Sequence, residues 1–160
     1  MILICYDGSP DSQSAIAHAG ELMHGEPATV LTVWESFIDV MTRTGAGMGY
    51  WTQEIHLEEI DADSEQSARA RADEGVEHAR RAGLNPQPLT SVRGATIADT
   101  ILAKADEVEA KAIVLGTRGL TGVKSLLLGS VSHAVLQHAD RPVMVVPSPE
   151  IAAKRVANRR

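Results

Sequence analysis

The chain has 160 residues, which suits one domain with a single core, and its formal net charge of −6 argues against a whole-domain nucleic-acid binder. No stretch approaches the ~18 apolar residues of a membrane-spanning helix, and residues 1–4 are too short for the apolar part of a signal peptide. The one cysteine, Cys5, fits a reducing compartment. We therefore expect a cytoplasmic protein that binds neither nucleic acid nor membrane.

Five short apolar runs predict the strands of a sheet. Each has the length of a buried strand and is bounded by glycine, proline or polar residues. In chain order they cover residues 2–6, 28–34, 88–93, 111–115 and 142–146. Prolines precede the third run, which indicates an edge strand because proline cannot donate to a sheet ladder.

Helical patterns lie between these runs. The first begins with Ser9 as N-cap and Pro10 at the first helical position. The second is long, over residues 54–82, and its acidic start and basic end match the helix dipole. A third begins at Thr96, which is a suitable capping residue, and the last covers residues 130–138.

This alternation predicts a single α/β domain with an open five-stranded parallel sheet and helices on both faces. Ligands bind such sheets beyond the carboxyl ends of the strands, where the strand order reverses. Asp7 follows the first strand and Gly116 follows the fourth. If these two strands are neighbours at the reversal, Asp7 and Gly116 face the same crevice.

Two regions do not follow the alternation. Residues 35–53 predict a flexible loop insertion, which is either a mobile loop without a dedicated role or a lid or partner-contact surface. Residues 149–160 form a basic tail that we expect to be solvated, although such a tail could touch an acidic partner. The domain itself is predicted to cover residues 1–148.

The segment from Gly116 to Ser130 predicts an anion site. It follows an apolar strand and precedes a helix, whose first N–H groups have no internal partner and whose dipole favours negative charge. Glycines let the backbone approach a phosphate where a Cβ would clash. Val123 separates a glycine from Lys124, so the segment does not match the phosphate loop of Walker-type proteins. The pattern indicates a nucleotide phosphate held by main-chain amides.

Within this segment, Gly116, Gly119, Gly129 and Ser130 have the spacing Gly-x2-Gly-x9-Gly-Ser. With this motif between the fourth strand and the last helix, the chain resembles the universal stress protein family, specifically its ATP-binding branch. The resemblance covers nearly the whole chain, up to the last strand. It implies a Rossmann-like fold of the adenine nucleotide alpha hydrolase type. It also implies a role in stress-response regulation and homodimers that pair through the last strand, residues 142–147.

The resemblance implies site residues as well. Asp7 and Val33 would border the adenine and ribose with Cys5 nearby, the glycine segment would line the ribose and phosphates, and the start of the last helix would hold the phosphate chain. The expected nucleotide-binding residues are Cys5, Asp7, Val33, Leu115, Gly116, Arg118, Gly119, Gly129, Ser130, Val131 and Ser132. The implied ligand is ATP, or else AMP, ADP or a cyclic nucleotide. A magnesium or manganese ion would sit on its phosphates rather than on protein ligands.

The residues give little support to catalysis. The sequence has no H-E-x-x-H metal motif, no G-x-S-x-G nucleophile elbow and no Walker lysine. Donors that bind the ground state and the transition state equally give affinity without turnover. We expect a binding module with slow or absent ATP hydrolysis. Three alternatives stay open: a slow ATPase or phosphoryl-transfer enzyme at the same crevice, an interaction protein whose crevice is empty, and a flavodoxin-like FMN carrier.

Overall fold

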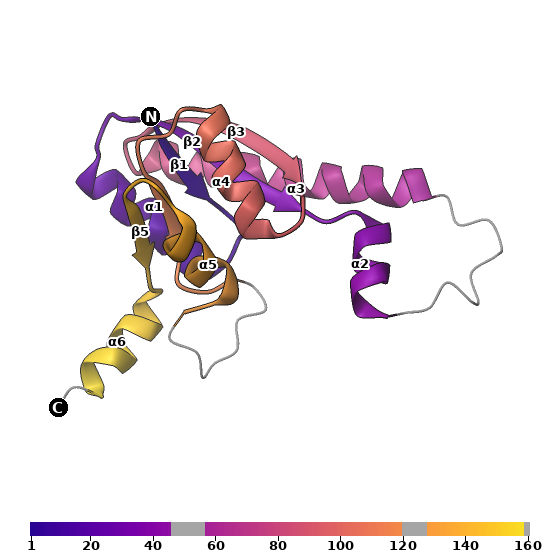
Figure 1. Cartoon of the computed structure of the whole chain (residues 1–160). Helices are drawn as coiled ribbons and strands as arrows, with labels where there is room; N and C mark the ends of the chain where they lie inside the picture. The colour runs from indigo at the N-terminus through magenta and orange to yellow at the C-terminus, as the bar shows by residue number, and fades with distance from the viewer. Residues whose placement is uncertain (46–56, 120–127, 159–160) are drawn as a thin grey trace.

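The computed structural model describes residues 1–45, 57–119 and 128–158. They form one five-stranded sheet in the order β3-β2-β1-β4-β5, in which every neighbouring pair is parallel (Figure 1). The strands are β1 (Ile2–Cys5), β2 (Pro27–Trp34), β3 (Asn85–Val92), β4 (Ile113–Gly116) and β5 (Val143–Val146). The predicted open parallel sheet is confirmed, with β3 and β5 at its two edges.

The third strand begins earlier than predicted. It pairs with β2 along its whole length, from Asn85 opposite Pro27 to Val92 opposite Trp34. The prolines within it had suggested a later start. An edge strand tolerates them because one side of its backbone has no strand to pair with.

Six helices belong to the described residues, and most begin at a side-chain cap. They are α1 (Pro10–Leu22), α2 (Phe37–Thr44), α3 (Leu57–Arg81), α4 (Ile97–Glu107), α5 (Ser130–His138) and α6 (Pro149–Ala157). Ser9, Ser36, Thr96 and Ser148 each accept a hydrogen bond from the backbone N–H three residues further on. The predicted bounds of the last domain helix, 130–138, agree with α5.

The helices cover both faces of the sheet. One buried apolar cluster joins α1 and α3 to the sheet, and a second cluster joins α4 and α5 to the opposite face. Small residues let α3 approach closely: a Cβ built on Gly75 would lie 2.8 Å from side-chain atoms of Tyr6 and Val30. Although the chain has few aromatic residues, small side chains let its helices pack closely on the sheet, so the core is densely packed.

The region expected to be a flexible loop, residues 35–53, contains a helix. Ser36 caps α2, and Gly45 ends it in the left-handed conformation at φ 66°. The backbone N–H of Phe37 donates to Asp61 Oδ1 at 2.7 Å, which ties α2 to α3. Together with the first turns of α3, this helix forms an arm beyond the sheet (Figure 1). Residues 46–53 of the predicted loop lie outside the described residues.

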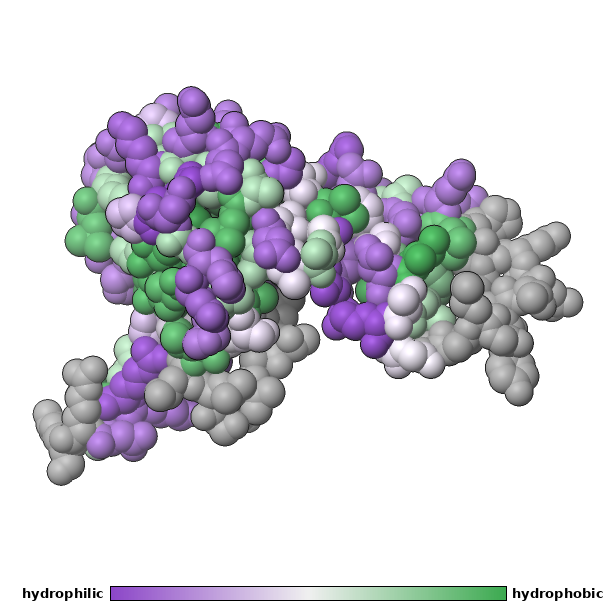
Figure 2. All heavy atoms as spheres, viewed as in Figure 1, coloured by the Kyte–Doolittle hydropathy of each residue, from purple (hydrophilic) through white to green (hydrophobic). Residues whose placement is uncertain are grey.

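Within the predicted basic tail, residues 149–157 form α6. This helix has no buried residue, and Lys154 pairs with Glu150 one turn earlier. No helix among the described residues is both long enough and apolar enough to cross a membrane. Figure 2 shows hydrophilic residues over much of the visible surface of the sheet domain, and hydrophobic residues on the arm. On that arm, Ile38 and Leu57 are 54% and 36% exposed.

Candidate functional site

A cavity of about 500 Å³ opens where β1 and β4 end. These strands are neighbours, and the chain runs outward from them in opposite directions, to β2 and β3 on one side and to β5 on the other. The cavity therefore lies at the point where the strand order reverses, which is where parallel sheets bind ligands. The expected placement of Asp7 and Gly116 at a single crevice is confirmed.

The cavity brings together the residues predicted from the sequence. All eleven line it: Cys5, Asp7, Val33, Leu115, Gly116, Arg118, Gly119, Gly129, Ser130, Val131 and Ser132. Sequence reasoning missed seven further lining residues: Tyr6, Ser12, Leu31, Arg71, Ile97, Ile101 and Thr117. Thr117 lies inside the glycine motif and could have been included. Those from α3 and α4 carry no local motif, because only the packing of these helices brings them to the strand ends.

The start of α5 offers unsatisfied backbone donors to the cavity. Its N-cap is Gly129, and no side chain caps this helix. Ser130, Val131 and Ser132 are its first residues, and the N–H groups at these positions have no partner within a helix. Because the positive end of the helix dipole adds to these donors, the arrangement favours an anion.

Thr117 connects the two ends of the glycine segment. Its N–H donates to Val146 O at 2.9 Å, and its hydroxyl donates to the Asp11 carboxylate. Its carbonyl oxygen accepts from Gly129 N at 2.7 Å and from the Ser132 hydroxyl at 3.0 Å. The Ser132 hydroxyl is thus used within the protein, although the sequence had suggested a phosphate ligand. Its contribution to an anion would come from its backbone N–H.

Close packing explains two of the glycines. A Cβ on Gly116 would lie 2.7 Å from Asp11 Cβ and 2.8 Å from the backbone carbon of Asp11. A Cβ on Gly119 would lie 2.7 Å from Asp7 Oδ2. Gly116 therefore lets β4 end against α1, and Gly119 lets the segment approach the Asp7 carboxylate.

Charged side chains line the cavity unevenly. Among its described lining residues, Arg71 and Arg118 stand against one carboxylate, Asp7. Asp7 Oδ1 accepts from Ser9 N at 3.0 Å, and Arg118 N donates to the buried Asp11 at 3.1 Å. The Nε atom of Arg118 is buried and has no hydrogen-bond partner in the described part of the chain. The cavity is locally cationic within an acidic protein, which favours an anionic ligand.

Burial keeps two lining side chains uncharged. Burial, and secondarily the charge of Asp7, raise the pKa of the Cys5 thiol to about 12. Burial and a hydrogen bond to Glu74 raise the pKa of Tyr6 to about 12 as well; its hydroxyl donates to Glu74 Oε1 at 2.9 Å. Cys5 is therefore a thiol rather than a reactive thiolate at neutral pH.

A parallel α/β domain with an anion-favouring cavity at its strand reversal defines a class of small-ligand-binding proteins. Residues 1–147 match the Universal stress protein family, and the chain belongs to it. It is 31% identical over 147 residues to the universal stress protein YxiE of Bacillus subtilis, which covers 91% of this chain and 97% of that protein.

Solved structures share the fold. The protein MJ0577 superposes with a TM-score of 0.72 at 20% identity, covering 91% of this chain and 94% of that one. The universal stress protein of Archaeoglobus fulgidus, solved in complex with dAMP, gives a TM-score of 0.58 at 23% identity, covering 91% and 95%. Two similar folds were solved with cAMP (TM-score 0.59, 21% identity) and, from Arabidopsis thaliana, with AMP (TM-score 0.57, 17% identity).

Proposed function

We propose that this protein binds ATP or a related adenine nucleotide in the cavity and acts as a cytoplasmic, non-catalytic module of stress-response regulation. The observation that carries the proposal is the meeting of four separate segments, residues 5–7, 33, 115–119 and 129–132, around one cavity. Proteins of similar fold that were solved with dAMP, cAMP and AMP bound support an adenine nucleotide as the ligand.

The phosphates would lie at the start of α5. The first residues of this helix line the cavity, no side chain caps the helix, and Arg118 adds a planar guanidinium to the same cavity. The described residues hold no group of three or more histidine, cysteine, aspartate or glutamate side chains placed to bind a metal. A magnesium or manganese ion would accordingly be held by the phosphates and water.

The base would lie against the apolar part of the cavity. Besides Cys5, six lining residues belong to the cluster on the α4 and α5 face: Leu31, Val33, Ile97, Ile101, Leu115 and Val131. Together they come from β2, β4 and both helices, so they form a continuous apolar wall on one face of the sheet. An adenine ring is flat and largely apolar on its faces, which suits such a wall.

The same geometry argues for binding rather than turnover. Asp7 is the single carboxylate among the described lining residues, and one of its oxygens accepts the Ser9 N–H. Main-chain donors at α5 serve the bound nucleotide as well as any transition state, so they raise affinity without raising the rate. A single-turnover rate with magnesium and ATP above roughly 0.1 s⁻¹ would overturn this part of the proposal.

We propose that two copies pair through the last strand, residues 142–147. β5 is an edge of the sheet, and its residues Val143, Met144 and Val145 are only partly buried. An apolar edge strand of this kind needs a cover, which a second copy supplies. Sedimentation equilibrium tests the pairing, since a monomer at micromolar concentration would contradict it.

The nucleotide itself is tested in two measurements. Mass spectrometry of the small molecules released from freshly purified, denatured protein should detect an adenine nucleotide. Calorimetry of the stripped protein should then give saturable binding of ATP, AMP or cAMP. A yellow protein that releases FMN, or a protein that binds none of the adenine nucleotides, would overturn the proposal.

A further inference from the structure

Arg71 interrupts the buried stripe of α3 where that helix passes the strand ends. Ala68, Ala72 and Gly75 on the same side of the helix are buried against the sheet. Arg71 is three residues after Ala68 and four before Gly75, so helical spacing places it on that face. It is partly buried and lines the cavity. Because burying a charged group among apolar residues is costly, an arginine in this stripe is expected to face a polar surface.

Its contacts hold it over the turn after β1. A Cβ placed on Gly8 would lie 3.6 Å from Arg71 Nε and 3.7 Å from its Cδ, so the side chain lies along this turn. Gly8 has φ 83°, a conformation that glycine adopts without strain. No ion pair or hydrogen bond joins Arg71 to another residue in the described ranges. Within the described part of the chain, its guanidinium therefore has no protein acceptor, and its side chain lines the cavity.

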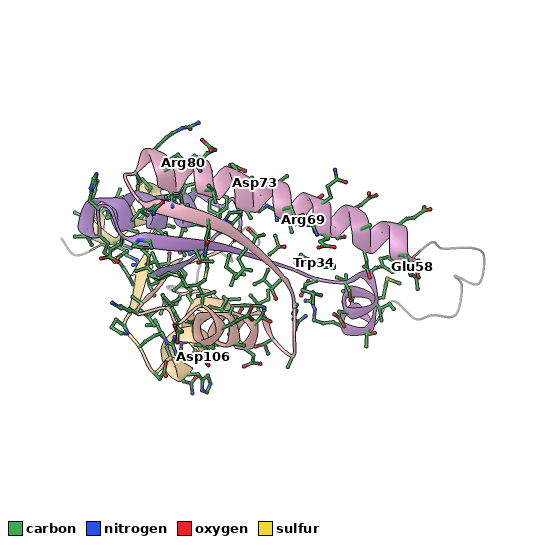
Figure 3. The ribbon with its side chains drawn as sticks, turned by 90° about the horizontal axis from the view of Figure 1, so that it is seen from above. Trp34, Glu58, Arg69, Asp73, Arg80 and Asp106 are labelled. Atoms are coloured by element: carbon green, nitrogen blue, oxygen red, sulfur yellow. The ribbon has the colours of Figure 1, made fainter. Side chains whose placement is uncertain are left out.

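Other arginines of α3 behave differently. Arg69, two residues earlier, pairs with Glu65 at 2.6 Å and its side chain is 67% exposed, and Arg80 pairs with Glu77. Figure 3 shows Arg69 and Arg80 along this helix, seen from above. Arg71 is thus distinguished from its neighbours by its place rather than by its residue type, and Arg69 provides a matched control.

The cavity has three chemically distinct walls. The apolar wall lies on the α4 and α5 face, and the donors for an anion lie at the start of α5. Asp7, Gly8 and Arg71 form the third wall, where α3 from the opposite layer of the fold meets the end of β1. In a nucleotide, the sugar joins the base to the phosphates. The third wall therefore faces the sugar when the base and phosphates occupy the other two.

We infer that Arg71 is a specificity-determining residue that donates hydrogen bonds to the ribose hydroxyls of the bound nucleotide. A guanidinium only donates and a carboxylate only accepts, whereas a hydroxyl does both. Arg71 and Asp7 together match two adjacent hydroxyls, and their opposite charges cancel, which suits a neutral sugar better than a further phosphate. The inference rests on the proposed function, because it assumes a nucleotide in the cavity.

Calorimetry of Arg71→Met with a series of ligands tests the inference. A hydrogen bond from a charged donor predicts an affinity loss of about tenfold for AMP, ADP and ATP alike. Inorganic tripolyphosphate and 2′,3′-dideoxyATP, which have no ribose hydroxyl pair, would lose only the general attraction of the cationic charge, so both should lose clearly less affinity than ATP does. Arg71→Lys keeps the charge without the planar fork and should fall between wild type and Arg71→Met. Arg69→Met should change nothing.

Each alternative outcome is distinct. A loss that grows with the number of phosphates would place Arg71 at the phosphates and overturn the inference. An equal loss for ATP and the dideoxy analogue would place Arg71 at the base and would also overturn the inference. Unchanged binding of all the nucleotides would overturn it as well. If Arg71→Met fails to fold, the comparison of Arg71→Lys with wild type on ATP and the dideoxy analogue decides. A wild-type protein that binds no adenine nucleotide would instead overturn the proposed function.

Discussion

Replacing Thr117 by valine should destabilise the protein through one buried charged hydrogen bond. Thr117 is 1% exposed, and its hydroxyl donates to the carboxylate of Asp11, which is itself 6% exposed. Valine has nearly the same volume, so the cost is electrostatic rather than steric. A hydrogen bond to a charged group contributes about 1.5–3 kcal/mol. For a chain of this size, 1 kcal/mol corresponds to roughly 2–4 °C, so the melting temperature should fall by about 3–12 °C.

A matched substitution isolates the role of the charge. Thr32 is also 1% exposed, but its hydroxyl donates to a neutral acceptor, Tyr6 O, at 2.9 Å. Thr32→Val should therefore cost only about 1 kcal/mol in urea denaturation. In an Asp11→Asn background, the cost of Thr117→Val should fall to about the same value, because the acceptor is then neutral. Equal losses from Thr117→Val in the two backgrounds, or a loss below about 0.5 kcal/mol, would refute the reasoning.

Three further predictions concern the ligand and pH. Gly129→Val should abolish ATP binding in calorimetry, because a Cβ there would lie 3.3 Å from Thr117 O and 3.6 Å from Arg118 Cα, inside the site. The melting temperature should fall by less than about 4 °C, because φ −71° and ψ 161° are open to any residue, and a lost circular dichroism spectrum would show a structural glycine instead. Asp7→Ala should weaken AMP more than inorganic phosphate, and equal weakening would contradict a nucleoside-side role. Burial raises the pKa of Cys5 from 9.0 to about 12, so the folded state keeps a proton that the unfolded state loses, and the free energy of unfolding should fall as pH rises from 9 to 12. Denaturation of Cys5→Ala should show a shallower fall, and an identical slope would argue against a buried thiol.

The sheet and most of the site could be predicted because their signals are local. The glycine motif lies directly between a strand and a helix, and Asp7 directly follows β1, so strand ends alone place them together. The helix α2 was missed although Ser36 and Gly45 mark its ends. Its eight residues are amphipathic, but they are fewer than the roughly 10–12 that distinguish a helix from other short apolar runs, and the glycines that follow indicated a loop.

Long-range partners explain what the sequence could not show. Asp11 and Thr117 are 106 residues apart, and nothing near either residue indicates the hydrogen bond between them. Arg71 is one of several arginines in a highly charged helix, and composition offers no reason to separate it from Arg69. The packing of α3 on the sheet brings Arg71 to the cavity. Residues of this kind depend on packing, which local sequence patterns do not encode.

Local chemistry rather than overall charge determines which ligand this acidic protein takes. Its net charge of −6 repels anions at long range, but physiological salt screens such charges over about 8 Å. Within the cavity, the start of α5 and two arginines face one carboxylate. Main-chain donors at the start of α5 do not depend on side-chain identity, so they would serve any ligand that carries a phosphate. If the protein binds a nucleotide as proposed, discrimination among nucleotides must come from side chains outside the motif, and Asp7 and Arg71 are the charged side chains of this kind that line the cavity.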